Sequence, residues 1–461
     1  MRQQFPITLT ALASLILLAV PSSAFTRAAW VPAIQEQVED VSARSASSST
    51  HGRANLARPG EPGGKGLAIR TAKALTVPFE GEQFIDNAMV LIRDGLIEAV
   101  GPVSEVPVPV GYEVLDIGDQ WLAPGMVELH AHIAGTFDIN DMVYLTNPGV
   151  RASTAVRPGD GKLKLGLAGG TTTMLFIPGS GTNIGGQGVL LKTGLDTYEA
   201  MEVRNPGSMK LAQAGNPERW LIRPGRSFMN WNTRNTLERG VAYAKRHEAA
   251  QESGEAKPEK DIQFEVIRSL YNNETQISTH TQIYQVANMT LTMVAQELGL
   301  PVYIDHGTFN AYRTAPRAME LGVSAILGPR GIDVPSYGMQ RWAGTNPERI
   351  QGVAAGYQER GMTMIGFNTD SPVIAQEELL VQASMAVRYG FKWDKLETIR
   401  GLTIIPAKTA GIDHIVGSLE VGKHADLLVV TGDPADPRCG INTVFIEGKK
   451  VYDTATDRRR W

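Results

Sequence analysis

The sequence is poor in cysteine, in aromatic residues and in excess charge. Cys439 is the single cysteine, which excludes an intramolecular disulfide, a cysteine-based zinc site and an iron–sulfur cluster. Lys and Arg total 44 against 48 Asp and Glu, so the chain lacks the basic excess typical of nucleic-acid-binding proteins. Aromatic residues make up only 7%, and no long heptad run is present, which argues against a nucleic-acid stacking platform or a coiled coil. Any chemistry must therefore come from His, Asp, Glu, Lys and backbone groups.

Long hydrophobic runs are also scarce, and the longest lies in the first 24 residues. There Arg2 precedes an apolar run that begins at Ile7, and small residues before Phe25 resemble a cleavage site. The run is too short for a membrane span, which needs about 20 apolar residues. We therefore expect residues 1–24 to be a signal peptide and the protein to be periplasmic or secreted, with no membrane anchor after cleavage. A buried core helix is the alternative.

Residues 25–66 are predicted to be a flexible linker. From Val41 the composition shifts to Ser, Ala, Arg, Gly and Pro, which cannot bury enough apolar surface to offset the chain entropy lost on folding. His51 lies in this stretch, and we expect it to be solvated.

The rest of the chain has short strand-like runs at both ends and an alternating pattern between them. The terminal runs are bounded by turn signals and cover residues 88–93, 96–100, 113–117, 425–432 and 443–453. Between them, strand-like runs alternate with helical patterns such as 237–256 and 282–298, which favours a parallel α/β architecture. We predict a (β/α)8 TIM-like barrel over residues 123–415. Residues 67–122 and 416–461 would together form one small β-sandwich domain.

Four histidines and one aspartate follow strand-like runs in this pattern. His130 and His132 end the first run, and residues i and i+2 of a strand point to the same face. His280, His306 and Asp370 end three further runs, and the carboxyl ends of barrel strands meet at the face that carries active sites. Imidazole and carboxylate ligands suit zinc or a similar divalent ion, so the pattern predicts a metal site. The other histidines after residue 66 lack this placement and are expected to be structural or solvated: His247, His414 and His424.

Several motifs occur in an order that resembles the amidohydrolase superfamily of metal-dependent hydrolases. They are DGLIEAVG, WLAPGMVELHAH, GLAGGTTTM, the runs ending STH and IDH, FNTDSP, and GSLEVGKHADLLVV leading to VFIEGKKVYD. The resemblance covers about residues 67–454 and is strongest to the imidazolonepropionase-related group, which contains many amidases and peptidases. It implies a distorted TIM barrel with His130 and His132 on strand 1, His280 on strand 5, His306 on strand 6 and Asp370 on strand 8.

The resemblance also implies metal-assisted hydrolysis of a carbon–nitrogen bond in a small-molecule substrate. A zinc-class ion would lower the pKa of its bound water to about 7, and the hydroxide would attack an amide, cyclic amide or dipeptide-like carbonyl. Asp370 would act first as general base and then as general acid. Two alternatives stay open: a mononuclear deaminase or cyclic-amide hydrolase on the same barrel, and a non-catalytic periplasmic metal or ligand binder. The sequence does not specify the substrate or the oligomeric state, and a homo-oligomer stays open.

The number of metal ions depends on strand 4. Many superfamily members bridge two metals with a carboxylated lysine or a glutamate from this strand. Lys210 is the candidate here, with Lys192 as a rival one strand earlier and an ordinary rim cation as the alternative for Lys210. Gly215 stands where the related group usually has the glutamate of Gly-Glu-Asn-Pro, so one ion and two ions both remain open.

Three more side chains are candidate substrate contacts. The glycine-rich stretch 178–187 lacks the Lys-Ser/Thr of a phosphate loop, and its glycines predict a close backbone approach to the substrate. Asn183 and Gln187 would then supply polar contacts; a plain turn is the alternative. Arg313 follows the run that ends at His306 and would meet a substrate carboxylate, or else be a solvent-exposed helix arginine.

Overall fold

The computed structural model describes residues 66–457, except for 136–138, 141, 143, 220–222 and 345–348. The predicted signal peptide and the linker up to residue 65 lie outside the described residues. The described part falls within one compact unit. Among its helices, none combines the length and the apolar character that a membrane crossing requires.

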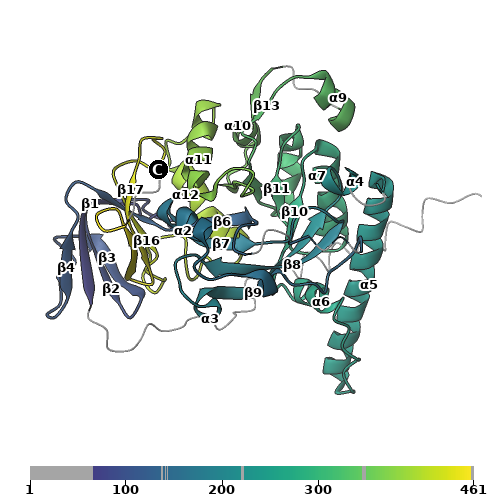
Figure 1. Ribbon diagram of the computed structural model, residues 1–461, viewed down its shortest axis with the longest axis horizontal. Coiled ribbons are helices and arrows are strands. Elements are labelled where there is room, and N and C mark those ends of the chain that lie inside the picture. The colour runs from purple at the N-terminus through teal and green to yellow at the C-terminus, as the bar shows by residue number, and fades with distance from the viewer. Residues whose placement is uncertain are drawn as a thin grey trace, which may run out of the picture. The chain divides into compact units, whose positions relative to one another are not determined.

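Both ends of the described chain contribute strands to one eight-stranded sheet (Figure 1, left). The N-terminal strands are β1 (Leu67–Ala74), β2 (Ile85–Arg93), β3 (Leu96–Pro102), β4 (Glu113–Asp116) and β5 (Trp121–Pro124). The C-terminal strands are β16 (Leu427–Val430), β17 (Ile441–Ile446) and β18 (Lys449–Asp453). Strand β5 joins the two groups, because it pairs in parallel with β1 and antiparallel with β16. Alternate side chains such as Ile69, Val90 and Leu427 fill an apolar core on this sheet.

The middle of the chain forms two sheets whose strands follow one another in chain order. The five-stranded sheet contains β6 (Met126–Ala131), β7 (Thr171–Phe176), β8 (Ile184–Lys192), β9 (Glu202–Ala212) and β10 (Ile277–His280). The three-stranded sheet contains β11 (Ile304–His306), β12 (Ala325–Leu327) and β15 (Ile365–Phe367). Isolated backbone bridges link the sheets at both edges: Ile277–Val302 and Thr281–His306 beside β10 and β11, and Ala131–Ser371 between β6 and the segment after β15. A separate hairpin pairs β13 (Ile332–Asp333) with β14 (Gln351–Gly352).

One strand departs from the expected parallel arrangement. Strand β8 runs antiparallel to both of its neighbours, β7 and β9. Only residues 177–183 connect β7 to β8, and a connection this short cannot carry the chain back to begin a parallel strand. The predicted glycine-rich stretch is therefore part loop and part strand, because Ile184–Gln187 already belong to β8.

Helices lie between the strands and complete a mixed α/β fold (Figure 1). They are α2 (Gly161–Ala168), α3 (Tyr198–Met201), α4 (Asn216–Arg219), α5 (Arg226–Ser253), α6 (Glu265–Tyr271), α7 (Tyr284–Thr290), α8 (Ala315–Glu320), α9 (Tyr337–Ala343), α10 (Val353–Gln358), α11 (Leu379–Arg388), α12 (Glu397–Leu402) and α13 (Ile404–Thr409). Short 3₁₀ helices are η1 (Ala152–Ala155), η3 (Ala311–Thr314) and η4 (Gln376–Glu378), and η2 (Leu291–Glu297) is a π-helix.

Two helices differ in extent from their sequence predictions. The helix expected at 237–256 is the second half of α5, which ends at Ser253. The next residue, Gly254, adopts a left-handed conformation with φ of 72° and terminates the helix. Gly240 lets α5 pack closely on α6, since a Cβ there would lie 2.5 Å from Ile267. The helix expected at 282–298 is divided into α7 and the wider-wound η2.

Candidate metal centre

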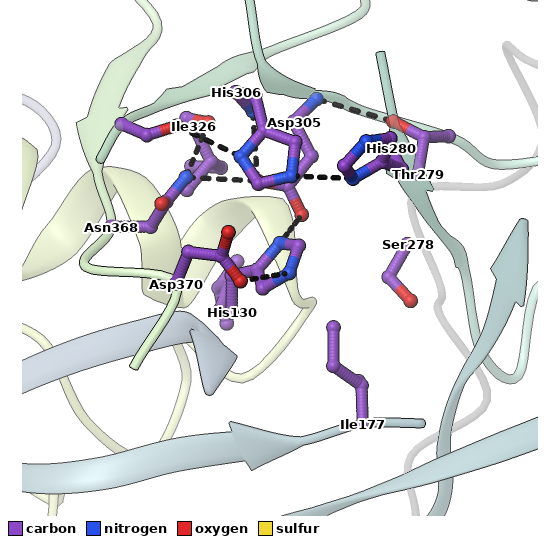
Figure 2. Close-up of polar contacts among 12 residues, drawn as sticks. His130, Ile177, Ser278, Thr279, His280, Asp305, His306, Ile326, Asn368 and Asp370 are labelled. Atoms are coloured by element: carbon purple, nitrogen blue, oxygen red, sulfur yellow. Dashed lines mark hydrogen bonds and ion pairs between the residues drawn. The ribbon is translucent and has the colours of Figure 1, made fainter. Parts of the chain in front are cut away.

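His130 and His132 extend from the end of β6 with their ring orientations fixed by other strands. Nδ1 of His130 lies 2.5 Å from Oδ2 of Asp305, and both side chains are fully buried (Figure 2). Nδ1 of His132 donates to the backbone carbonyl of Ile177 at 2.8 Å. Nε2 of each ring is then directed at Asp370, whose Oδ1 lies 3.2 Å from both nitrogens.

His280 and His306 form a second pair on β10 and β11. Nδ1 of His306 donates to the carbonyl of Gly328 at 2.8 Å. Its Nε2 therefore carries a lone pair in the neutral ring, and it lies 2.9 Å from Nδ1 of His280 (Figure 2). The ring centroids of His130 and His306 are 4.5 Å apart, so the two pairs adjoin one another.

Asp370 follows β15 in a strained backbone conformation. Its φ is 49°, and His306 has a φ of 66°, so both lie in the left-handed region that non-glycine residues rarely adopt. Neighbouring groups hold the segment: Glu128 on β6 accepts from the Thr369 backbone N–H at 2.6 Å and from the Thr369 hydroxyl at 2.5 Å. Such strain persists where the surroundings fix it, and it clusters at functional sites.

The charge states of three histidines and Asp370 favour a bound cation, whereas that of His130 is set by its two carboxylate neighbours. Burial lowers the pKa of His280 well below its ordinary value, that of His306 to about 4, and also that of His132. These rings are thus neutral at pH 7, and neutral imidazole is the form that binds metal. Burial opposes ionisation of Asp370, but the neighbouring His130 and His132 hold the pKa of Asp370 well below its usual range. Burial would also lower the pKa of His130, but Asp305 and Asp370 keep it above the ordinary value.

The donor set fits a divalent ion of the zinc class. Two overlapping groups have ligand atoms within 4.8 Å of one another, His130–His132–Asp370 and His130–Asp305–His306. Imidazole and carboxylate are the ligands that such ions take, and ligating histidines commonly donate their other nitrogen to a carboxylate or carbonyl. His130, His132, His306 and Asp370 would hold an ion here, with His280 contributing through Nδ1.

Lys210 lies beside this cluster, whereas Lys192 does not. Lys210 is fully buried on β9, with Nζ 3.2 Å from Nε2 of His130, and burial lowers its pKa to about 8. Nζ of Lys192 lies 2.7 Å from Asp426 and 2.8 Å from Nδ1 of His424. Because β8 is reversed, Lys192 pairs opposite Thr173 near the start of β7, at the end away from His132. The structure therefore brings Lys210, rather than Lys192, to the predicted ligands.

The three candidate substrate contacts are engaged elsewhere. The amide of Asn183 donates to the Ala212 carbonyl at 2.8 Å and accepts from Asn232 at 2.7 Å, while Gln187 donates to the Pro148 carbonyl at 2.8 Å. Arg313 is exposed on η3, over the ring of Tyr284 at 5.2 Å. Among the described contacts, none links these three side chains to the histidine cluster. Asn183 and Gln187 tie the glycine-rich stretch to its surroundings.

Two residues that reach the cluster are absent from the sequence prediction. Asp305 orients His130. The feature of the sequence that could have indicated this role is an acidic residue directly before the candidate ligand His306. Alternation along a strand places neighbouring side chains on opposite faces, which hides this role. Ser180, in the glycine-rich stretch, has Oγ 2.9 Å from Nδ1 of His280. The sequence directs attention to the larger polar residues of that stretch, but the small hydroxyl is the one that reaches the histidines.

Comparison with known proteins agrees with this geometry. Residues 279–451 match the model of the amidohydrolase family. An amidohydrolase of known structure from Thermotoga maritima MSB8 superposes with a TM-score of 0.73 at 27% identity, covering 84% of this chain and 100% of that chain. This chain resembles the amidohydrolases. The superfamily resemblance expected from the motifs is thereby confirmed.

Two curated amidohydrolase relatives align over shorter shares of their length. The protein named "Amidohydrolase tasK" from Hapsidospora irregularis is 24% identical over 419 residues, which are 79% of this chain and 40% of that protein. An imidazolonepropionase from Agrobacterium fabrum is 29% identical over 86 residues, 16% of this chain and 20% of that protein. This chain thus covers well under two thirds of either relative.

Proposed function

We propose that this amidohydrolase relative is a metal-dependent hydrolase that cleaves a carbon–nitrogen bond in a small molecule. The bond would be an amide, a cyclic amide or a dipeptide-like bond. The observation that carries the proposal is the convergence of four histidines and Asp370 from the ends of four strands. Nδ1 of His132 and Nδ1 of His306 are each hydrogen-bonded to a backbone carbonyl, which leaves Nε2 of each ring directed at the cluster. The family match over residues 279–451 supports it.

The proposed scaffold is a distorted TIM-type barrel. The bridges Thr281–His306 and Ala131–Ser371 support closure, because they join the two central sheets at both edges. The candidate ligands would then lie at the carboxyl-end face, where barrel enzymes place their active sites. The sheet that unites both chain ends through β5 and β16 would be the accompanying small β-sandwich domain.

The roles of the side chains follow from their placement. His130, His132, His306 and Asp370 would hold an ion of the zinc class, which would lower the pKa of a bound water to about 7 and polarise the scissile carbonyl. Asp370, ionised and 3.2 Å from the rings of His130 and His132, takes a proton from the attacking water and passes it to the leaving nitrogen. Asp305 keeps His130 in its working orientation. The full burial of His130 and His306 excludes bulk water, which strengthens the electrostatic interactions of these groups.

The test combines metal analysis with a hydrolysis screen. Purified protein is analysed for metal by mass spectrometry and assayed against panels of amides, dipeptides and lactams. Chelation is expected to abolish turnover, and zinc is expected to restore it. Release of ammonia with no new carboxyl group would instead favour a deaminase. Stoichiometric metal without turnover of any panel would favour a non-catalytic metal binder.

The same metal analysis, applied to two lysine variants, addresses the number of ions. If a carboxylated Lys210 bridges two ions, Lys210→Met lowers the metal content by at least one ion per chain. Lys192→Met serves as the control, because Lys192 lies with Asp426 and leaves the metal content unchanged. Equal metal content in both variants would favour a single ion held without Lys210.

We also propose that residues 1–24 direct export to the periplasm or the exterior. The support is the pattern of Arg2, the apolar run from Ile7 and the small residues before Phe25. N-terminal sequencing of protein from the native host is expected to begin near Phe25, and material that retains Met1 would contradict cleavage.

A further inference from the structure

The glycine-rich loop after β7 places a hydroxyl in the histidine cluster. The carbonyl of Ile177, just after β7, accepts from Nδ1 of His132, and Oγ of Ser180 lies 2.9 Å from Nδ1 of His280. Four consecutive residues thus extend from one histidine pair to the other. Ser180 is only 7% exposed.

Glycine makes this close approach feasible. A Cβ on Gly179 would lie 2.5 Å from the side chain of Asn140, which in turn accepts from the backbone N–H of Gly181 at 3.0 Å. A Cβ on Gly185 would lie 3.2 Å from the carbonyl of Gly179 and 3.5 Å from Cγ of Lys210. The loop is therefore fixed on both sides of Ser180 and held against the lysine of the cluster.

The hydroxyl of Ser180 depends on the same nitrogen that a metal ion would use. Within the part of the chain that the structure describes, the hydroxyl has no second hydrogen-bond partner beside Nδ1 of His280. That nitrogen faces the lone pair of His306 Nε2 at 2.9 Å, so a proton or a cation must lie between the two rings. When His280 and His306 share a cation, the hydroxyl proton of Ser180 is free to turn toward a bound oxygen atom.

We propose that Ser180 is a catalytic residue that donates a hydrogen bond to the carbonyl oxygen of the substrate, where negative charge develops during hydrolysis. This role rests on the proposed function. The loop geometry supplies a donor that is already in position, so little reorganisation is needed in the transition state. The expected ligand is an oxyanion, derived from an amide carbonyl, located beside His280.

The experiment compares Ser180→Ala with Ser180→Thr, which keeps the hydroxyl, and with Ser208→Ala as the matched control. Ser208 is a buried serine on β9 whose hydroxyl contacts Ser278 at 2.9 Å, and among the described contacts it has none with a histidine. Three quantities are measured on the metal-loaded proteins: metal affinity by chelator competition, kcat and KM on the best substrate of the screen, and calorimetric binding of methylphosphonate, a tetrahedral oxyanion.

The proposal expects Ser180→Ala to bind metal within about threefold of the parent protein, because no ligand is lost. Its kcat should fall about 10²–10³-fold, as when an oxyanion donor is removed, while KM changes little. Methylphosphonate affinity should fall at least about tenfold. Ser180→Thr should recover most of both losses.

Three results would overturn the proposal. A parallel loss of metal affinity would make Ser180 a ligand, and losses no larger than those of Ser208→Ala would make its role structural. Absence of methylphosphonate binding by the parent would remove the oxyanion site. If the parent binds methylphosphonate but hydrolyses no panel substrate, the proposed function fails, while the binding difference between Ser180→Ala and Ser208→Ala still decides the role of Ser180.

Discussion

The carboxylate of Asp305 and the imidazole of His130 are 2.5 Å apart, and both are completely buried. The other oxygen of Asp305 accepts from the side chain of Asn368 at 2.9 Å and from the backbone N–H of His306 at 3.0 Å (Figure 2). One carboxylate therefore sets the orientation of the first-strand histidine and contacts the backbone of a second candidate ligand. Carboxylates placed in this way fix the tautomer of a ligating histidine and raise its basicity.

Replacement of Asp305 by alanine is expected to weaken metal binding about 10–100-fold, the range typical for loss of a carboxylate that supports a ligating histidine. The measurement is the metal Kd of folded protein by chelator competition. Asp426→Asn is the control, since Asp426 is also buried but binds Lys192. Equal metal affinities for the two variants would remove Asp305 from the metal centre.

Simultaneous replacement of His130 and His132 by alanine is expected to eliminate bound metal. Two of the proposed ligands, both of which face Asp370, disappear together. Metal per chain is measured after dialysis, with circular dichroism to verify folding. His247→Ala is the control and should keep its metal, because the His247 ring packs against Tyr243 within α5, with the ring centroids 4.5 Å apart. Full metal occupancy in the double variant would refute the site.

Asp370→Asn separates proton transfer from metal binding. Asparagine keeps the shape and one oxygen but cannot accept a proton at useful pH. We expect kcat per bound metal ion to fall by at least about 10²-fold, while most of the metal remains on the histidines. If activity fell only in step with metal loss, Asp370 would be a ligand alone. A ratio within about threefold, near 0.65 kcal/mol of barrier, would exclude the catalytic role.

The pH dependence of stability is expected to include a contribution from Glu447. Burial opposes its ionisation, but the hydrogen bond with His424 and the charge of Lys192 lower its pKa from 4.5 to about 2. A carboxyl group with a lowered pKa in the folded state stabilises the fold above its unfolded pKa, and this stability is lost as pH falls toward the folded pKa. The contribution is therefore complete near pH 7 and declines between about pH 4.5 and 2.

Glu447→Gln should accordingly lower the free energy of unfolding at pH 7 by roughly 1.5–3 kcal/mol, the range for hydrogen bonds to charged groups. The difference from the parent protein should shrink as pH falls from 4.5 to 2. Urea unfolding of both proteins at several pH values measures this difference. Glu80→Gln is the control, because Glu80 is exposed. A difference that stays constant down to pH 2 would contradict the assignment.

The sequence predicted the ligand cluster better than the path of the chain between the ligands. Strand-end positions identify His130, His280 and Asp370, because side chains at the carboxyl ends of neighbouring strands must meet. The reversal of β8 was not predicted, since a buried strand has the same apolar pattern in either direction. That reversal also explains why Lys192 appeared to rival Lys210. Strand direction depends on the length of the connection, which periodicity does not record.

The roles of Asp305 and Ser180 could not be predicted from the local sequence around each residue. Each acts on a histidine from another strand, His130 in one case and His280 in the other, so its role depends on pairing between distant segments. Local pattern identifies the ligand types, but it does not identify the groups that orient them. Pattern alone likewise did not indicate that Asn183 and Gln187 donate to backbone carbonyls, since those carbonyls become neighbours only in the folded protein.

The pairing of β5 with β16 sets the time at which this protein can finish folding. Pro124 pairs with Leu427, so β5 lacks this neighbour until the chain has been synthesised as far as residue 427. Pairings of such long sequence separation form slowly, and unpaired strand edges are prone to aggregate in the meantime. The same delay would be compatible with the export proposed above, because a chain whose terminal sheet is incomplete has not yet reached its final folded state.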